Sequence, residues 1–358
     1  MKGYLLDDIA KSLITNLDTI DNTKKLKNIS LVYAFNGTGK TRTSRTIEIL
    51  TENKSLCYNA LIEDLFHWDN RECILYVDTD SWLIKIILEQ GLENAVTDNF
   101  RDLVLSKIEP EFDLDNGKIT FNIATGDDEA VRNIKISKGE ESLFIWTIYY
   151  TVLEMVVAVL NEKEENRYTS EFDNVEYIII DDPISSIDDT KIIAIAIKII
   201  DLVRIYNGVG SHKLKFLITT HHSLFYNILF NNYNKQKHFI LTKKDNLYEL
   251  HEQNNDSPFG YHLLIKKEIE EAIERDNIKK YHFNYFRTLL EKTANFLGYS
   301  NWADCISSEN RTHFLKIINH YSHGKISDIE YKEISHEDKA LFKEVYSNFI
   351  RSFNWKEN

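Results

Sequence analysis

Cysteine, proline and glycine are all scarce in this sequence, which has only 3 Cys, 3 Pro and 12 Gly in 358 residues. The three cysteines, Cys57, Cys73 and Cys305, are isolated and odd in number. They therefore exclude a disulfide framework and a zinc site made of thiolates. Because glycine and proline are rare, a cluster of glycines indicates a specific backbone geometry.

The sequence also lacks features of secreted and membrane-embedded chains. Its first residues, MKGYLLDDIAKSL, contain no apolar segment followed by a cleavage site. The longest apolar run, residues 144–160, is interrupted by Glu154 and is too short and mixed for a membrane span. A composition of 43% hydrophobic and 28% charged residues is typical of a globular protein. We expect a cytoplasmic protein with no membrane partner.

Charge is distributed unevenly along the chain. The formal net charge is -13, which argues against a generic DNA-coating protein. Residues 261–358 contain 15 Lys and Arg against 15 Asp and Glu, so the whole acidic excess lies in residues 1–260. Six of the 12 histidines lie in the neutral part. This division indicates two regions. The polar stretch QNNDSP at residues 253–258 places the boundary near residue 255, which predicts two domains, residues 1–255 and 256–358.

The pattern of short apolar runs predicts an α/β fold. Strands are expected at residues 29–35, 175–180, 214–219 and 237–241. Helical patterns such as residues 189–205 separate them, and this alternation favours a mostly parallel sheet. Beyond residue 261 the strand signal disappears, and helices are expected at residues 263–274, 281–297 and 339–353. The second domain is therefore predicted to be all-helical.

A glycine-containing loop lies between the first strand and a helical stretch. Its sequence, AFNGTGKT at residues 34–41, matches a P-loop with alanine in the first glycine position. Lys40 is expected to reach the β- and γ-phosphates and Thr41 to offer a hydroxyl to Mg²⁺. The backbone N–H groups around the phosphates would come from Asn36, Gly37, Thr38 and Gly39. The alternative is an ordinary glycine turn with a chance lysine.

Carboxylates follow the strand at residues 175–180. Asp181 is positioned to hold Mg²⁺ through water, and Asp182 to orient an attacking water. The segment SSID, ending at Asp188, comes shortly after them. Taken singly, these residues also fit an ordinary strand end and an exposed turn.

Two further segments complete a nucleotide site. Ser137, Gly139 and Glu140 begin a long apolar helix, whose N-terminus can receive a γ-phosphate from another subunit. His221 ends the strand at residues 214–219 and is placed to contact a γ-phosphate. Singly, these segments fit an exposed turn and a core histidine; together and in this order they predict nucleotide binding.

This order of motifs resembles that of the ABC-type ATPases. The resemblance implies that two heads enclose two nucleotides, so a homo-oligomer built on head-to-head dimers is expected. The sequence departs from the family in its signature, SKGE, and in having Asp182 where a glutamate is usual. No clear glutamine loop is present, and the candidates to replace it are Asn59, Glu63 and Asp64.

The C-terminal region contains a second set of candidates. Arg287 and Glu291 are spaced i,i+4 on a predicted helix, and His320 and His323 lie three residues apart. A histidine could move the protons of RNA cleavage, and a guanidinium could stabilise charge on the phosphorus, without a metal. The alternatives are a surface salt bridge and an exposed turn.

Seven segments, quoted in chain order, resemble the bacterial anticodon nucleases of the PrrC type: ISLVYAFNGTGKTR, YNALIEDLFHWDN, SKGEESLFIW, IIIDDPISSIDD, FLITTHHSLFYNILFN, FRTLLEKTANFLGYSNW and IINHYSHG. The resemblance implies an ABC-type NTPase head joined to a ribonuclease that cuts tRNA, typically tRNA-Lys, in the anticodon loop. It assigns the catalytic roles to Arg287, Glu291 and His323, and 2′,3′-cyclic phosphate and 5′-OH ends to the products. It further implies control by GTP or ATP with Mg²⁺, a thymidine nucleotide at a second site, and silencing by a type I restriction–modification complex in antiphage defence.

Two other functions fit the same architecture. A sensor ATPase would use its C-terminal helices only to bind a partner effector, and it would assemble with nucleotide without cutting RNA. A DNA-repair type ABC ATPase would hydrolyse ATP faster with DNA and would need a partner nuclease. Loss of toxicity in His323→Ala would distinguish the anticodon nuclease from both.

Overall fold

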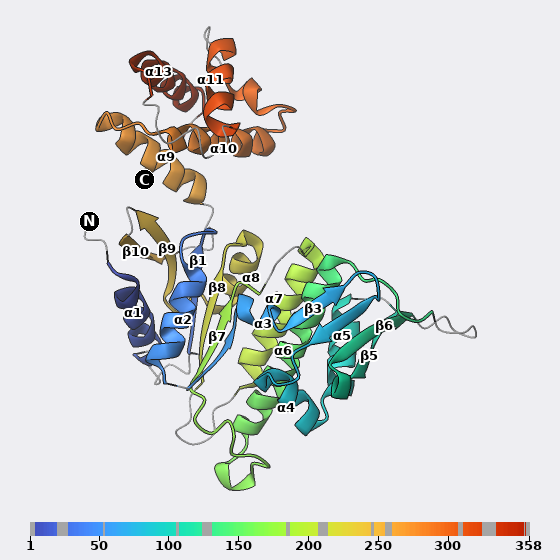
Figure 1. Ribbon diagram of the computed structural model, residues 1–358. Helices are drawn as coiled ribbons and strands as arrows, with labels where there is room; N and C mark the ends of the chain where they lie inside the picture. Colours follow the sequence, from blue (N-terminus) through green and yellow to red (C-terminus); the bar gives the residue numbers. More distant parts are fainter. Residues whose placement is uncertain are drawn as a thin grey trace. The chain divides into compact units, whose positions relative to one another are not determined.

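The computed structural model divides the chain into two compact units, Met1–Pro258 and Phe259–Asn358 (Figure 1). It describes residues 4–19, 28–52, 54–104, 107–123, 131–183, 187–206, 214–244, 247–254, 260–306, 311–323, 334–353 and 355. The domain boundary predicted near residue 255 lies outside the described residues. We treat the two units separately.

The first unit is built on a six-stranded sheet with the order β10-β9-β1-β8-β7-β2. The strands are β1 (Asn28–Ala34), β2 (Ser55–Tyr58), β7 (Tyr177–Asp181), β8 (Lys215–Thr220), β9 (His238–Lys244) and β10 (Leu247–Gln253). All neighbours pair in parallel except β9 and β10. The central strands are buried on both faces, which explains their continuous apolar sequences. This sheet confirms the predicted fold class.

The register of the sheet places several strand ends together. Thr219 of β8 pairs with Val32 of β1 on one side and with Asp181 of β7 on the other. Because the strands are parallel, their carboxyl ends share one edge of the sheet, where ligands of open α/β sheets bind. The loops after β1, β7 and β8 therefore begin at this edge.

Helices cover both faces of this sheet. Figure 1 shows α1 (Leu6–Asp18) and α2 (Lys40–Leu50) on one side and α7 (Asp189–Ile205) and α8 (Ser223–Tyr233) on the other. Successive side chains of a strand point to opposite faces of the sheet, so each face offers apolar residues to a helix layer. Leu217 of β8 and Ile179 of β7, for example, belong to the hydrophobic cluster that also contains residues of α1 and α2.

Helix α6 (Lys138–Asn161) is a long apolar helix of the first unit. By length and composition it could cross a membrane, but 89% of its most apolar stretch is buried inside the protein. It packs against α3 (Ala60–Glu63), α4 (Trp82–Gln90), α5 (Glu93–Val104) and α7. It is therefore a buried core helix of the first unit.

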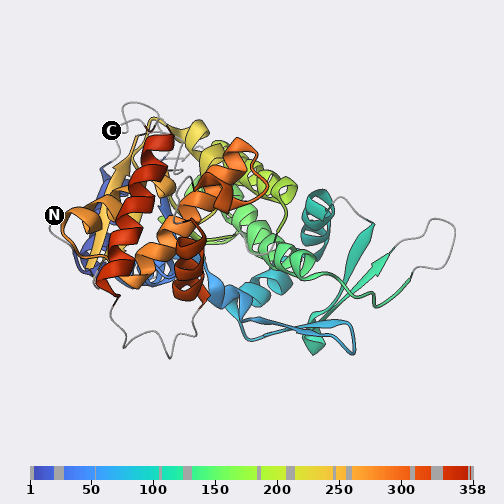
Figure 2. The same cartoon turned by 90° about the horizontal axis from the view of Figure 1, so that it is seen from above.

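A second, antiparallel sheet was not predicted from the sequence. Its order is β3-β4-β6-β5, with β3 (Phe66–Asp69), β4 (Ile74–Val77), β5 (Ile108–Asp113) and β6 (Lys118–Ile123). Phe121 of β6 packs against Phe144 of α6, with ring centroids 4.9 Å apart. Figure 2 shows these strands gathered on one side of the unit. Short 3₁₀ turns occur at η2 (Leu114–Asn116) and η3 (Glu164–Asn166).

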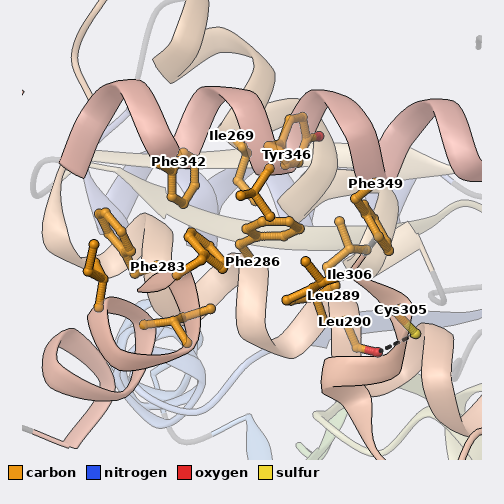
Figure 3. Packing of buried hydrophobic residues seen from close by; sticks show 14 of the residues in the cluster. Ile269, Phe283, Phe286, Leu289, Leu290, Cys305, Ile306, Phe342, Tyr346 and Phe349 are labelled. Carbon is orange, nitrogen blue, oxygen red and sulfur yellow. Dashed lines mark hydrogen bonds between the residues drawn. The ribbon is translucent and has the colours of Figure 1, made fainter. Parts of the chain in front are cut away.

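The described residues of the second unit form helices, as predicted. These are α9 (Gly260–Glu274), α10 (Lys280–Leu297), the 3₁₀ turn η4 (Trp302–Cys305), α11 (Arg311–His323) and α13 (His336–Ser352). Phe286 of α10 lies at the centre of their core and contacts the rings of Phe342, Tyr346 and Phe349 of α13 (Figure 3). Residues 286, 290 and 294 share the buried face of α10 because of the helical period.

Candidate nucleotide site and candidate nuclease site

The predicted P-loop joins β1 to α2. Gly37 and Gly39 adopt left-handed backbone angles, with φ of 80° and 96°, which favour glycine. Gly39 is also the N-cap residue of α2. A Cβ atom there would lie 3.2 Å from the Tyr248 ring of β10, closer than most real contacts of this kind. The angle therefore favours glycine at residue 39, and a larger residue would also have to displace the Tyr248 ring by a few tenths of an ångström.

Lys40, at the start of α2, turns its side chain toward the carboxyl edge of the sheet. Its Nζ donates to the carbonyl oxygen of Ala34 and to Oδ1 of Asn36, both at 3.1 Å. It also lies 3.3 Å from Oδ2 of Asp182. The side chain is only 7% exposed, so its charge is held at a fixed place beside the loop. A buried cation next to a loop whose glycines let the backbone curl is suited to binding a phosphate group.

Asp181 ends β7 and is buried. The hydroxyl of Thr219 donates to its carboxylate. Burial raises the pKa of Asp181, and the charge of Asp182 adds to the rise, whereas hydrogen bonds from Thr219 and Thr41 oppose it. Thr41 and Asp181, the two predicted Mg²⁺ residues, are thus brought together. Their hydroxyl and carboxylate oxygens are the donors that Mg²⁺ prefers, so they fit this metal.

Asp182 adopts a left-handed backbone angle, φ 53°, which aspartate tolerates better than most residues. Nδ1 of His221 lies 2.6 Å and 2.8 Å from its two carboxylate oxygens. Burial acts to raise the pKa of Asp182, but the hydrogen bond from His221 and the charge of Lys40 outweigh it and lower that pKa. Two predicted site residues, Lys40 and His221, therefore contact the carboxylate of a third, Asp182.

The predicted signature lies at the N-terminus of α6. Ser137 is the N-cap residue, and its Oγ accepts from the Glu140 backbone N–H at 3.2 Å. Oε2 of Glu140 accepts in return from the Ser137 N–H at 2.7 Å. Gly139 lies in the first turn between them. This capping box explains why serine and glutamate stand three residues apart.

Asp188 caps α7 in a similar way. Its Oδ1 accepts from the Lys191 N–H at 3.0 Å. The hydrogen bond from the Thr190 hydroxyl lowers the pKa of Asp188. Residues 184–186 of the same predicted motif lie outside the described residues.

The candidates for a glutamine loop follow β2. Tyr58 pairs with Ile180 of β7, so Asn59 lies at the same sheet edge as Asp181. Asn59 is buried, and its side-chain amide contacts Sγ of Cys57 at 3.2 Å. Burial raises the pKa of Tyr58, and the charge of Glu63 and a hydrogen bond to it add to the rise. Asn59 and Glu63 are thus near the predicted nucleotide site, whereas Asp64 follows α3.

In the second unit, Arg287 and Glu291 lie one turn apart on α10. Nε of Arg287 donates to Oε1 of Glu291 at 2.9 Å. The two side chains are 23% and 43% exposed, so the pair is accessible from solvent. His323 is the last residue of α11, but the side chains of His320 and His323 lie outside the described residues. The predicted pair is therefore formed, and the predicted triad stays a prediction.

The sequence did not reveal that Trp302 contacts Arg287 of this pair. The guanidinium carbon of Arg287 lies over the Trp302 ring, 5.3 Å from its centroid. The aromatic residues of α10 differ in burial, since Phe283 and Phe286 are core, whereas Phe296 is 90% exposed.

An anticodon nuclease from Escherichia coli is 37% identical to this chain over 379 residues. The alignment covers 95% of this chain and 95% of that protein. The chain belongs to the anticodon nuclease family. No protein-family model matches the chain.

Among solved structures, two SMC head domains are similar to parts of the chain. An SMC head bound to the C-winged helix domain of ScpA has a TM-score of 0.35 at 11% identity, covering 63% of this chain and 90% of that chain. The SMC head domain from Thermotoga maritima has a TM-score of 0.33 at 10% identity, with the same coverage of 63% and 90%. The fold assignment itself rests on the strand order and the P-loop described above.

Proposed function

We propose that this member of the anticodon nuclease family is an NTP-gated endoribonuclease that cuts tRNA, typically tRNA-Lys, in the anticodon loop. Its first unit binds GTP or ATP and hydrolyses it, and its second unit cleaves RNA without a metal. The observation that carries the proposal is identity of 37% to an anticodon nuclease over 95% of both chains. The Arg287–Glu291 pair and the P-loop supply chemistry that fits each half of this activity.

For the nucleotide site, we assign phosphate binding to Lys40 and the loop glycines. Asp182 orients the attacking water, and His221 holds the Asp182 carboxylate at 2.6 Å. Thr41 and Asp181 hold Mg²⁺, which neutralises charge on the phosphates when bound. Ser137, Gly139, Glu140 and Asp188 act on the nucleotide of a second subunit in a head-to-head dimer.

For RNA cleavage, the 2′-oxygen of a nucleotide attacks the adjacent phosphorus and the bond to the 5′-oxygen breaks. The products carry a 2′,3′-cyclic phosphate and a 5′-OH. His323 moves a proton at the attacking or the leaving oxygen. Arg287 stabilises the charge that develops on the phosphoryl oxygens. Glu291 holds the guanidinium through Nε. Because DNA has no 2′-OH, this chemistry selects RNA.

The wider setting is also a proposal that rests on the family. The protein acts in the cytoplasm as an oligomer, with a thymidine nucleotide at a second site of control. A type I restriction–modification complex keeps it silent, and release of the nuclease stops growth of an infected cell. These assignments define the partners to be sought by co-purification.

The test is incubation of the purified full-length protein with bulk tRNA, without nucleotide and then with GTP or ATP, followed by sequencing of the new RNA ends. We expect one cut in one anticodon loop, with ends that require cyclic-phosphate removal before ligation. Arg287→Ala should not cut. Intact tRNA under every condition, together with NTP hydrolysis, would contradict the proposal and favour a sensor ATPase that acts through a partner.

A further inference from the structure

We propose that Trp302 is a positioning residue of the nuclease site, which holds the Arg287 guanidinium in the orientation that RNA cleavage requires. This inference rests on the proposed function, because it acts through Arg287. It begins from the contact in which the guanidinium carbon lies over the indole, 5.3 Å from the ring centroid. An arginine over an aromatic face is attracted by the ring quadrupole.

Glu291 and Trp302 restrain Arg287 in different ways. Glu291 accepts from Nε at 2.9 Å and fixes one edge of the guanidinium. The guanidinium carbon lies over the face of the Trp302 ring, 5.3 Å from its centroid. All five N–H groups of a guanidinium point outward in its plane. A contact through the ring face therefore restrains the guanidinium in addition to its hydrogen bond with Glu291.

Trp302 lies in a turn that is held by hydrogen bonds. Gly298 ends α10 in a left-handed conformation, φ 76°, and the chain reverses there. Oδ1 of Asn301 accepts from the Ala303 N–H at 2.9 Å and caps η4, which begins at Trp302. The indole is partly buried against the core of the second unit.

The far end of this turn is fixed to the helix that carries the pair. Sγ of Cys305 contacts the carbonyl oxygen of Leu290 at 3.8 Å, and both side chains are buried (Figure 3). Nη2 of Arg311 binds Oδ1 of Asp304 at 2.6 Å. The turn that carries Trp302 is thus anchored to α10, the helix that carries Arg287. The position of the ring relative to the arginine is therefore defined within the second unit.

The test compares tRNA cleavage by Trp302→Leu and Trp302→Phe in the full-length protein. We expect the leucine variant to lose about two- to fivefold in kcat with little change in KM, because a cation–π contact at a partly exposed site has that size. The phenylalanine variant keeps an aromatic face and should recover most of the activity. Trp355→Leu is the matched control, since Trp355 packs against the same core and contacts Phe349.

A double-mutant cycle separates positioning from general packing. If Trp302 acts through Arg287, then Trp302→Leu should cost less than twofold in a background of Arg287→Lys, whose ammonium has no plane to orient. Equal losses in both backgrounds, or a Trp302→Leu variant as active as Trp355→Leu, would overturn the inference. If Trp302→Leu does not fold, Trp302→Met takes its place in the same comparison.

Failure of the inference and failure of the proposed function give different results. If Arg287→Ala cuts tRNA at the normal rate, the proposed active site is wrong. If Arg287→Ala is inactive while Trp302→Leu is fully active, only the role of Trp302 is wrong.

Discussion

The ammonium group of Lys40 lies 3.3 Å from Oδ2 of Asp182, the carboxylate that follows β7. This ion pair joins the residue proposed to bind phosphate with the residue proposed to orient water. A phosphate that binds Lys40 must therefore compete with a carboxylate held on its other side by His221. The contact makes the two residues energetically coupled.

Lys40→Ala should weaken nucleotide binding by about 10- to 100-fold, because it removes charge-assisted hydrogen bonds to phosphate. Equilibrium binding of a fluorescent GTP or ATP analogue measures this. Lys54→Ala is the control, since Lys54 is half-exposed and pairs with Glu176. Equal affinities for the two variants would refute the assignment of the P-loop lysine.

Neighbouring substitutions at residues 181 and 182 should shift stability in opposite directions. Burial raises the pKa of Asp181, so its ionised carboxylate destabilises the fold once the pH exceeds the unfolded-state pKa of about 3.9. Asp181→Asn should therefore raise the Tm at pH 7. The net effect of burial, His221 and Lys40 lowers the pKa of Asp182, whose ionised form therefore stabilises the fold at pH 7. Asp182→Asn should lower the Tm.

The differences in Tm between each variant and the wild type should become smaller at acid pH. The gain from Asp181→Asn should disappear below about pH 4, where Asp181 is protonated in both states. The loss from Asp182→Asn should persist to a lower pH and fall as Asp182 is protonated in the folded state. Thermal unfolding of the full chain between pH 3 and pH 7 measures this, where about 2–4 °C corresponds to 1 kcal/mol for a domain of this size. Shifts of the same sign at pH 7 would contradict the account.

Arg287→Ala should reduce tRNA cleavage by about 100-fold or more, the usual cost of removing a group that stabilises transition-state charge. Its effect on stability should be below about 1 kcal/mol, because the pair with Glu291 is solvent-accessible. Arg275→Ala is the matched control, since Arg275 also pairs with a glutamate at i,i+4, Glu271. If the Arg275 variant lost as much activity, the effect would belong to folding and not to chemistry.

Phe286→Ala should destabilise the second unit by about 3–5 kcal/mol, because it opens a cavity among four aromatic rings. Phe296→Ala on the same helix should change stability by less than about 0.5 kcal/mol, because Phe296 is 90% exposed. Chemical denaturation measures both. Similar losses for the two would mean that Phe286 does not form the core.

The main strands and helices could be predicted because their patterns are strong and local. Helix α7 occupies the predicted residues, and β7, β8 and β9 differ from prediction by one to three residues at their ends. The P-loop followed from glycine and lysine at fixed spacing, where chain geometry allows few other residues.

The second sheet was missed for a physical reason. Strands β3 and β4 have four residues each, and β5 contains Pro110, which strand patterns normally exclude. These strands are stabilised by tertiary packing on α6, and no local pattern encodes that contact.

The candidate sites also depend on tertiary contacts that no local sequence pattern encodes. The spacing of Arg287 and Glu291 predicted that they share a helix face. The contact with Trp302 could not be predicted, because it depends on the chain reversing at Gly298 and returning along α10. The pairing of Asp182 with both Lys40 and His221 likewise depends on the strand order, which brings together three loops far apart in the sequence.

The central claim is that the first unit gates a nuclease in the second. It is tested most directly by measuring NTP hydrolysis and tRNA cleavage in parallel on wild type, Lys40→Ala and Arg287→Ala. We predict that Lys40→Ala loses both activities, whereas Arg287→Ala loses cleavage and keeps NTP hydrolysis. Full cleavage by Lys40→Ala would contradict gating, and full cleavage by Arg287→Ala would contradict the nuclease site.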